Sequence, residues 1–223
     1  MHGDAAEPDL GELYASVRER VTSLVSQADE PALDTPVTAC PGWSVRDVVA
    51  HLTAVAEDVV AGRLTRPPSP AETADQVARY KDSDLGEVLA NWDAAAPGFE
   101  SVVNEFRVWP AVVDVTSHEH DIRAALGCPG ARDADAVWHA AQFLLDGLRP
   151  PVSLRVVVED AEFRLGPERG SNLTLTTNRF EALRWRMGRR SREQLATLDW
   201  SADPAAVLDH LVVFGPASYA IVE

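Results

Sequence analysis

The segment Ser44-Val-Arg-Asp-Val-Val-Ala-His-Leu-Thr-Ala-Val-Ala-Glu-Asp-Val-Val60 combines a helix start signal with a long apolar stripe. Ser44 is a favourable N-cap, and Asp47 three residues later gives a capping box, in which each side chain accepts a hydrogen bond from a backbone amide of the first turn. Apolar residues then recur at helical spacing as far as Val60. The segment therefore predicts an amphipathic helix with its apolar face in a core.

His51 lies at the edge of this apolar face, three residues after Val48 and four before Val55. A charged or unpartnered imidazole is costly in that position, so the ring needs a partner. Two interpretations are open. The ring is either a neutral histidine hydrogen-bonded to a backbone carbonyl, or a metal ligand that meets further ligands from another helix.

A second segment, Asp114-Val-Thr-Ser-His-Glu-His-Asp-Ile-Arg-Ala-Ala-Leu-Gly127, places Asp114, His118 and Asp121 on one helical stripe. A carboxylate and an imidazole four residues apart can hold the same ion. The alternative is a solvated face with contacts one turn apart. Packing this stripe against the helix of His51 would bring three ligands together and leave a fourth position for water or substrate.

Composition limits the classes of partner. The 223 residues carry 35 acidic and 20 basic side chains, and the formal charge of −15 argues against nucleic-acid and anionic-membrane binding. Small molecules or proteins are the expected partners. The chain shows no signal-peptide pattern and no apolar run long enough for a membrane helix, so we expect a cytoplasmic protein. Cys40 and Cys128 are too few for a disulfide framework, and we expect both to be packed, reduced thiols without an activating partner.

The chain divides into a helical part and a part of mixed periodicity. Helical spacing predicts further helices over residues 10–27, 85–106, 110–127 and 134–148. Residues 62–84 form a proline-rich loop and a polar stretch. After residue 150 the pattern alternates as in strands, and two short helices follow, at 179–187 and 204–213. We therefore predict an α+β protein, with a helical domain over 1–149 and a small α/β domain over 150–223.

Two motifs resemble the mycothiol-dependent maleylpyruvate isomerase family: Cys40-Pro-Gly-Trp-Ser-Val-Arg-Asp-Val-Val-Ala-His51-Leu and Asp114-x-x-x-His118-x-x-Asp121, which closes on Ala-Leu-Gly127. Phe180-Glu-Ala-Leu-Arg-Trp-Arg-Met-Gly-Arg-Arg190 and Asp199-Trp-Ser-Ala-Asp-Pro204 are similar to the C-terminal part of that family. The likeness covers most of the chain outside residues 63–108, and the first motif is the most specific. It implies an N-terminal DinB-like four-helix bundle.

The resemblance also implies a metal site. In that family a divalent metal is held by the histidine of the first motif and by a Glu-x-x-x-His pair, which corresponds to His51 and His118 here, with Asp114 where glutamate is usual. Aspartate is one methylene shorter, so metal binding depends on a closer approach of this carboxylate. Asp121 matches a family aspartate and is expected to orient a ligand. His120 stands where the family often has an aromatic residue, and we place it beside the ligands.

A catalytic arginine is implied in the second domain. Arg189 falls where the family has a Gly-Arg pair, and a guanidinium there could bind a substrate carboxylate through two hydrogen bonds. Arg190 is an equal candidate. The alternative for either residue is a solvent-exposed charge or a charge at a helix C-terminus.

The implied activity is that of an enzyme, a mycothiol-dependent isomerase or S-transferase acting on a small electrophile. Zinc is the expected ion, with nickel, iron and manganese as alternatives. The ion would lower the pKa of the bound thiol of mycothiol, and the thiolate would add to an activated cis double bond before rotation and elimination. A transferase would keep the adduct. Two other classes stay open: a metal-dependent hydrolase or lyase using metal-bound water, and a non-catalytic ligand-binding module.

Overall fold

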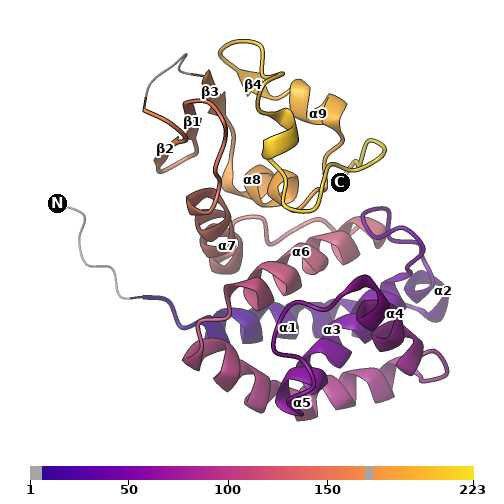
Figure 1. The fold of residues 1–223 in the computed structure, drawn as a ribbon. Coiled ribbons are helices and arrows are strands. Elements are labelled where there is room, and N and C mark those ends of the chain that lie inside the picture. Colours follow the sequence, from indigo (N-terminus) through magenta and orange to yellow (C-terminus); the bar gives the residue numbers. More distant parts are fainter. Residues whose placement is uncertain (1–6, 169–172) are drawn as a thin grey trace. The chain divides into compact units, whose positions relative to one another are not determined.

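The computed structural model describes residues 7–168 and 173–223, which divide into two compact units, Met1–Pro129 and Gly130–Glu223 (Figure 1). Within the described residues the first unit contains helices and the second combines helices with a sheet, so the predicted α+β class is confirmed. The division expected at residues 149–150 lies earlier. The reason is that α7 (Asp135–Asp146) packs against α8 (Arg179–Arg186), and so contributes its apolar face to the second unit.

The first unit is built on four long helices: α1 (Leu10–Ser26), α3 (Val45–Val60), α5 (Leu85–Glu105) and α6 (Trp109–Ala125). Both α5 and α6 pack on α1 and on α3, and the apolar stripes of all four helices meet in the core. Gly11 allows the close approach of α1 to α5, because a Cβ atom at this position would lie 2.7 Å from the carbonyl oxygen of Glu100.

The start of α3 has the predicted capping box. The Ser44 hydroxyl accepts the backbone amide of Asp47 at 3.2 Å, and the Asp47 carboxylate accepts the amide of Ser44 at 2.8 Å. The apolar face that follows is buried from Val45 to Ala56 except for the partly exposed Val55, whereas Val60 at the helix end is 49 % exposed. The helix that carries His51 is therefore fixed at its N-terminus by local interactions and along its length by burial.

Two short helices of the first unit were not predicted: α2 (Glu30–Leu33) and α4 (Pro70–Arg79). The polar stretch read from the sequence at this point contains α4, which packs on α3. It starts with a capping box between Ser69 and Glu72 and has Pro70 at its first turn. Among its side chains only Gln76 is buried, so the apolar period that reveals a helix is missing.

Asp58 of α3 links α4 and the loop before it to α3 through hydrogen bonds. Its buried carboxylate accepts hydrogen bonds from Arg63 at 2.8 Å, from Gln76 at 2.9 Å and from Arg79 at 2.8 Å. Burial by itself would raise the pKa of Asp58, but these three donors favour the charged form and lower the pKa below its usual value.

Replacing Asp58 by asparagine is expected to destabilise the protein by about 1–3 kcal/mol at pH 7, because two arginines lose a buried acceptor. A folded-state pKa below the unfolded value contributes stability that is present above about pH 4 and is lost as pH falls through the folded pKa. The difference between the parent and Asp58→Asn should therefore shrink in acid. Urea unfolding at several pH values measures this difference, and a constant difference down to pH 3 would contradict the role of the charge.

The second unit holds a four-stranded sheet of order β2-β1-β3-β4, formed by β1 (Leu154–Val157), β2 (Glu162–Leu165), β3 (Leu173–Thr176) and β4 (Asp199–Trp200). β1 and β3 are parallel, and the other pairs are antiparallel. The predicted alternation is confirmed, since every second residue of β1 and β3 is buried.

The helix predicted at 179–187 is α8, and a short helix, α9 (Arg192–Ala196), follows it. The helix predicted at 204–213 is wrong, because this segment contains only a 3₁₀ turn, Leu208–His210. That turn suffices to bury Val207, Leu208 and Leu211, whose spacing had suggested a longer helix. No helix in the part of the chain that the structure describes is long and apolar enough to cross a membrane.

Candidate metal centre

The three predicted ligands meet between α3 and α6. Nε2 of His51 lies 3.6 Å from one carboxylate oxygen of Asp114, and Nε2 of His118 lies 3.5 Å from the other. The two imidazole rings are 5.5 Å apart between centroids. One donor atom from each of the three residues lies within 4.8 Å of the others, although His51 and Asp114 are far apart in the sequence.

This donor set fits a small divalent cation. Ligands bonded at about 2.0–2.1 Å to a tetrahedral ion are separated by about 3.4 Å, close to the two distances between Asp114 and the histidines. The shorter side chain of aspartate therefore still reaches both rings. Both histidines are buried, whereas the side chain of Asp114 is 37 % exposed, so the group faces solvent on the carboxylate side.

His51 does not make the hydrogen bond expected of a structural histidine. Its Nδ1 atom is buried and has no hydrogen-bond partner among the described residues, and its Nε2 atom faces Asp114. The interpretation of a neutral ring bonded to a backbone carbonyl is therefore wrong. The ring is held instead by packing against Trp43, with 5.2 Å between ring centroids.

His118 is fixed by a carboxylate on each side. Its Nδ1 atom lies 3.0 Å from Asp121, which is itself buried, and its Nε2 atom faces Asp114. Burial alone would lower the pKa of His118, but the Asp114 carboxylate and the hydrogen bonds to both aspartates raise the pKa well above its usual value. Burial would likewise raise the pKa of Asp114, and the two histidines lower it. Both aspartates therefore favour the protonated form of the His118 ring.

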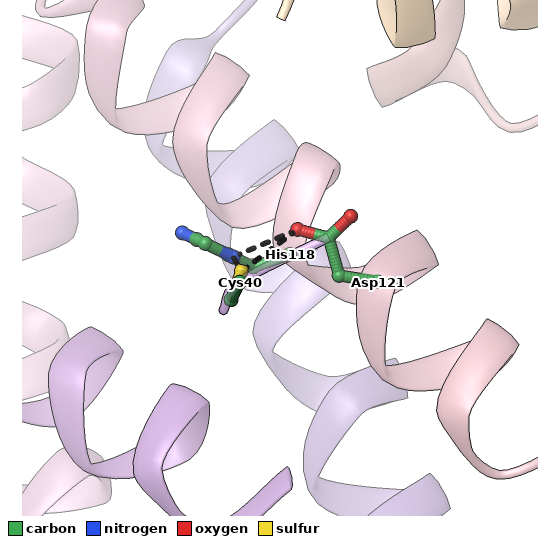
Figure 2. Close-up of side chains that lie close together, drawn as sticks. All are labelled: Cys40, His118 and Asp121. Carbon is green, nitrogen blue, oxygen red and sulfur yellow. Dashed lines mark hydrogen bonds and ion pairs between the residues drawn. The ribbon is translucent and has the colours of Figure 1, made fainter. Parts of the chain in front are cut away.

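Cys40 adds a sulfur atom to this cluster. Its Sγ atom lies 3.7 Å from Nδ1 of His118 and 3.6 Å from the Asp121 carboxylate (Figure 2). The sequence showed no partner for Cys40, and the structure places His118 and Asp121 beside it. The loop before α3 brings it there through a tight turn in which Gly42 has φ +88°, a conformation that favours glycine. The signal in the sequence was the Cys-Pro-Gly-Trp run itself, whose turn returns the chain toward His51.

Two further buried residues, Tyr14 and Glu119, escaped sequence analysis, whereas His120 was predicted to lie beside the ligands. Tyr14 of α1 is buried, accepts the indole N–H of Trp92 at 2.9 Å, and has a raised pKa because of burial and the nearby charge of Asp114. Glu119 is fully buried on the other side of α6. His120 is buried on the same helix, but it belongs to neither group of donor atoms that could share an ion.

The predicted arginines lie in the second unit. Arg190 is buried and pairs with Glu181 at 2.6 Å and with Glu223 at 3.4 Å, and Arg184 also pairs with Glu223. Arg189 is partly exposed, and its guanidinium donates to the carbonyl oxygen of Met187 at 2.7 Å. Arg190 thus has a structural function in holding the end of the chain.

Comparisons with known proteins found a family model and solved structures that match this chain. A family model described as the mycothiol maleylpyruvate isomerase N-terminal domain matches residues 14–143, which include the whole cluster and most of α7. The crystal structure of the mycothiol-dependent maleylpyruvate isomerase is 14 % identical, with a TM-score of 0.58, and the match covers 83 % of this chain and 90 % of that one. A histidine-to-alanine variant of a mycothiol-dependent maleylpyruvate isomerase matches over the same shares, with 12 % identity and a TM-score of 0.58. No curated protein sequence matches.

The fold and the cluster define an enzyme with a helical unit that gathers histidine and carboxylate donors and a smaller unit of mixed helix and sheet. Because the family model covers more than half of the chain, the protein belongs to the mycothiol-dependent maleylpyruvate isomerase family.

Proposed function

We propose that this protein is a metal-dependent enzyme that uses mycothiol as an S-transferase or cis-trans isomerase acting on a small electrophilic substrate. The observation that carries the proposal is the meeting of His51, Asp114 and His118 inside the region that the family model matches. The pairwise packing of α1, α3, α5 and α6 supports a DinB-like four-helix bundle as the scaffold.

The residues of the cluster have distinct tasks in this proposal. His51, Asp114 and His118 hold the ion, for which zinc is the first choice and nickel, iron and manganese are alternatives. Asp121 accepts a hydrogen bond from the N–H at Nδ1 of His118. This contact keeps the lone pair of the ring on Nε2, where it can bind the ion. When bound, the ion lowers the pKa of a coordinated thiol and makes a thiolate available at neutral pH. His120 is buried beside the ligands on α6 and supplies no donor to the ion.

Substrate binding is assigned to Arg189. The resemblance places Arg189 at the family's Gly-Arg pair, and Arg190 stays an equal candidate. A guanidinium can hold a carboxylate through two parallel hydrogen bonds. The substrate class is therefore a small carboxylic acid with an activated double bond.

The first experiment is elemental analysis of the purified protein, followed by assays with maleylpyruvate and mycothiol. We expect a bound divalent ion in the parent, its loss in His51→Ala and Asp114→Ala, and turnover that needs both metal and thiol. His210→Ala is the matched control, because this histidine is exposed in the second unit. Constant thiol concentration during turnover indicates an isomerase, and thiol consumption indicates a transferase.

Two results would replace the proposal. Metal-dependent turnover without any thiol would indicate a hydrolase or lyase. A parent protein that carries no metal, does not respond to a chelator or to added zinc or nickel, and still binds a small molecule would be a binding module.

A further inference from the structure

His118 is shared by two groups of donor atoms. Its Nε2 atom belongs to the group with His51 and Asp114, and its Nδ1 atom belongs to a second group with Cys40 and Asp121. In the second group the thiol comes from the loop before α3, and the other two donors lie one turn apart on α6 (Figure 2). The two groups thus lie on opposite edges of one imidazole ring.

The second group has the geometry of a metal site. Around a tetrahedral zinc with bonds of about 2.3 Å to sulfur and about 2.0–2.1 Å to nitrogen and oxygen, sulfur lies about 3.5 Å from each other donor, and nitrogen about 3.3 Å from oxygen. The observed separations are 3.7 Å from sulfur to nitrogen, 3.6 Å from sulfur to oxygen and 3.0 Å from nitrogen to oxygen. All three donors can reach one ion with shifts of a few tenths of an ångström.

The two groups differ in chemical character. The first offers nitrogen and oxygen, whereas the second offers a soft sulfur atom besides nitrogen and oxygen. Thiolate ligands select thiophilic ions over harder ions such as Mn²⁺. Asp121 is buried and Cys40 is partly exposed, so an ion reaches this group from the side of the loop.

We propose that Cys40, Nδ1 of His118 and Asp121 form a second metal position, selective for thiophilic divalent cations such as Cd²⁺ and Zn²⁺, which cannot be filled together with the first. An imidazole that keeps one proton offers a single lone pair. When an ion binds Nδ1, any proton there is released to solvent and the N–H at Nε2 donates a hydrogen bond to Asp114. When an ion binds Nε2, any proton there is released to solvent and the N–H at Nδ1 donates a hydrogen bond to Asp121. The thiol of Cys40 loses its proton to solvent as the sulfur bonds the ion.

The test is a titration of Cd²⁺ into metal-free protein, in a Cys128→Ser background that removes the exposed second thiol. We expect the ultraviolet charge-transfer absorption of a sulfur–cadmium bond to rise and to saturate at one ion per chain. Cys40→Ser should abolish the absorption, and Asp121→Asn should weaken cadmium binding by about tenfold or more. His51→Ala is the matched control, because it removes a ligand of the first position only, and its absorption should stay.

Three outcomes would overturn the proposal. They are the absence of the absorption in the parent, its persistence in Cys40→Ser, and its loss in His51→Ala. Saturation at two ions per chain would overturn the exclusive use of His118. If Cys40→Ser fails to fold, alkylation decides instead: bound Cd²⁺ should slow the reaction of Cys40 with iodoacetamide at least about tenfold in the Cys128→Ser protein, and an unchanged rate would contradict the site.

Discussion

Replacing His118 by alanine is expected to weaken zinc binding by more than about 100-fold. Loss of a residue that only orients a metal ligand weakens binding by about 10- to 100-fold, and loss of a ligand itself should cost more. The effect should exceed that of any other single change in the cluster, because this ring belongs to both donor groups. Competition with a chromogenic chelator measures the affinity, and elemental analysis measures the bound ion.

Asp121→Asn is the graded comparison. The amide keeps the size of the side chain, but its carbonyl is a weaker acceptor for the proton on Nδ1, so binding at the first position should weaken by about 10- to 100-fold. Circular dichroism of both variants shows whether α6 is intact. Full zinc affinity in folded His118→Ala would mean that the ion is held elsewhere.

Replacing Glu119 by alanine is expected to destabilise the first unit strongly. The fully buried carboxylate binds Arg20 of α1 through two hydrogen bonds, of 2.9 and 2.7 Å, and Arg123 one turn further along α6 through two more. Breaking a buried ion pair by removing one partner costs about 3–5 kcal/mol. We expect the lower end of that range, because Arg20 and Arg123 keep some contact with solvent. Urea unfolding of the parent and the variant gives the value.

Asp93→Asn is the control for this prediction. Asp93 pairs with Arg18 of α1 at 2.8 Å, but its side chain is 76 % exposed. An exposed ion pair contributes less than about 1 kcal/mol, so this variant should unfold close to the parent. Equal losses of stability in Asp93→Asn and Glu119→Ala would show that burial of the pair adds nothing.

The long helices were predictable because apolar residues recur in each of them at helical spacing. The apolar stripe and the capping box fixed α3 within its own segment, and Ser44 and Asp47 form the interaction that their spacing predicts. The helix α4 could not be found in this way, because it is held by Asp58 rather than by an apolar face. The domain boundary also escaped, because α7 has a helical period whichever unit it packs in.

For the site, the sequence by itself determined the chemical types of the donors and the spacing that aligns Asp114, His118 and Asp121 on one helix, because that alignment depends only on helical geometry. Tertiary structure decided which residues meet them. His51 reaches Asp114 only because α3 packs on α6, and Cys40 reaches His118 across 78 positions because a turn at Gly42 folds the loop back. It also decided that Glu119 is buried against Arg20. Such contacts depend on the angle and the distance at which helices pack. Packing of the whole core determines both quantities, so no local sequence pattern encodes them.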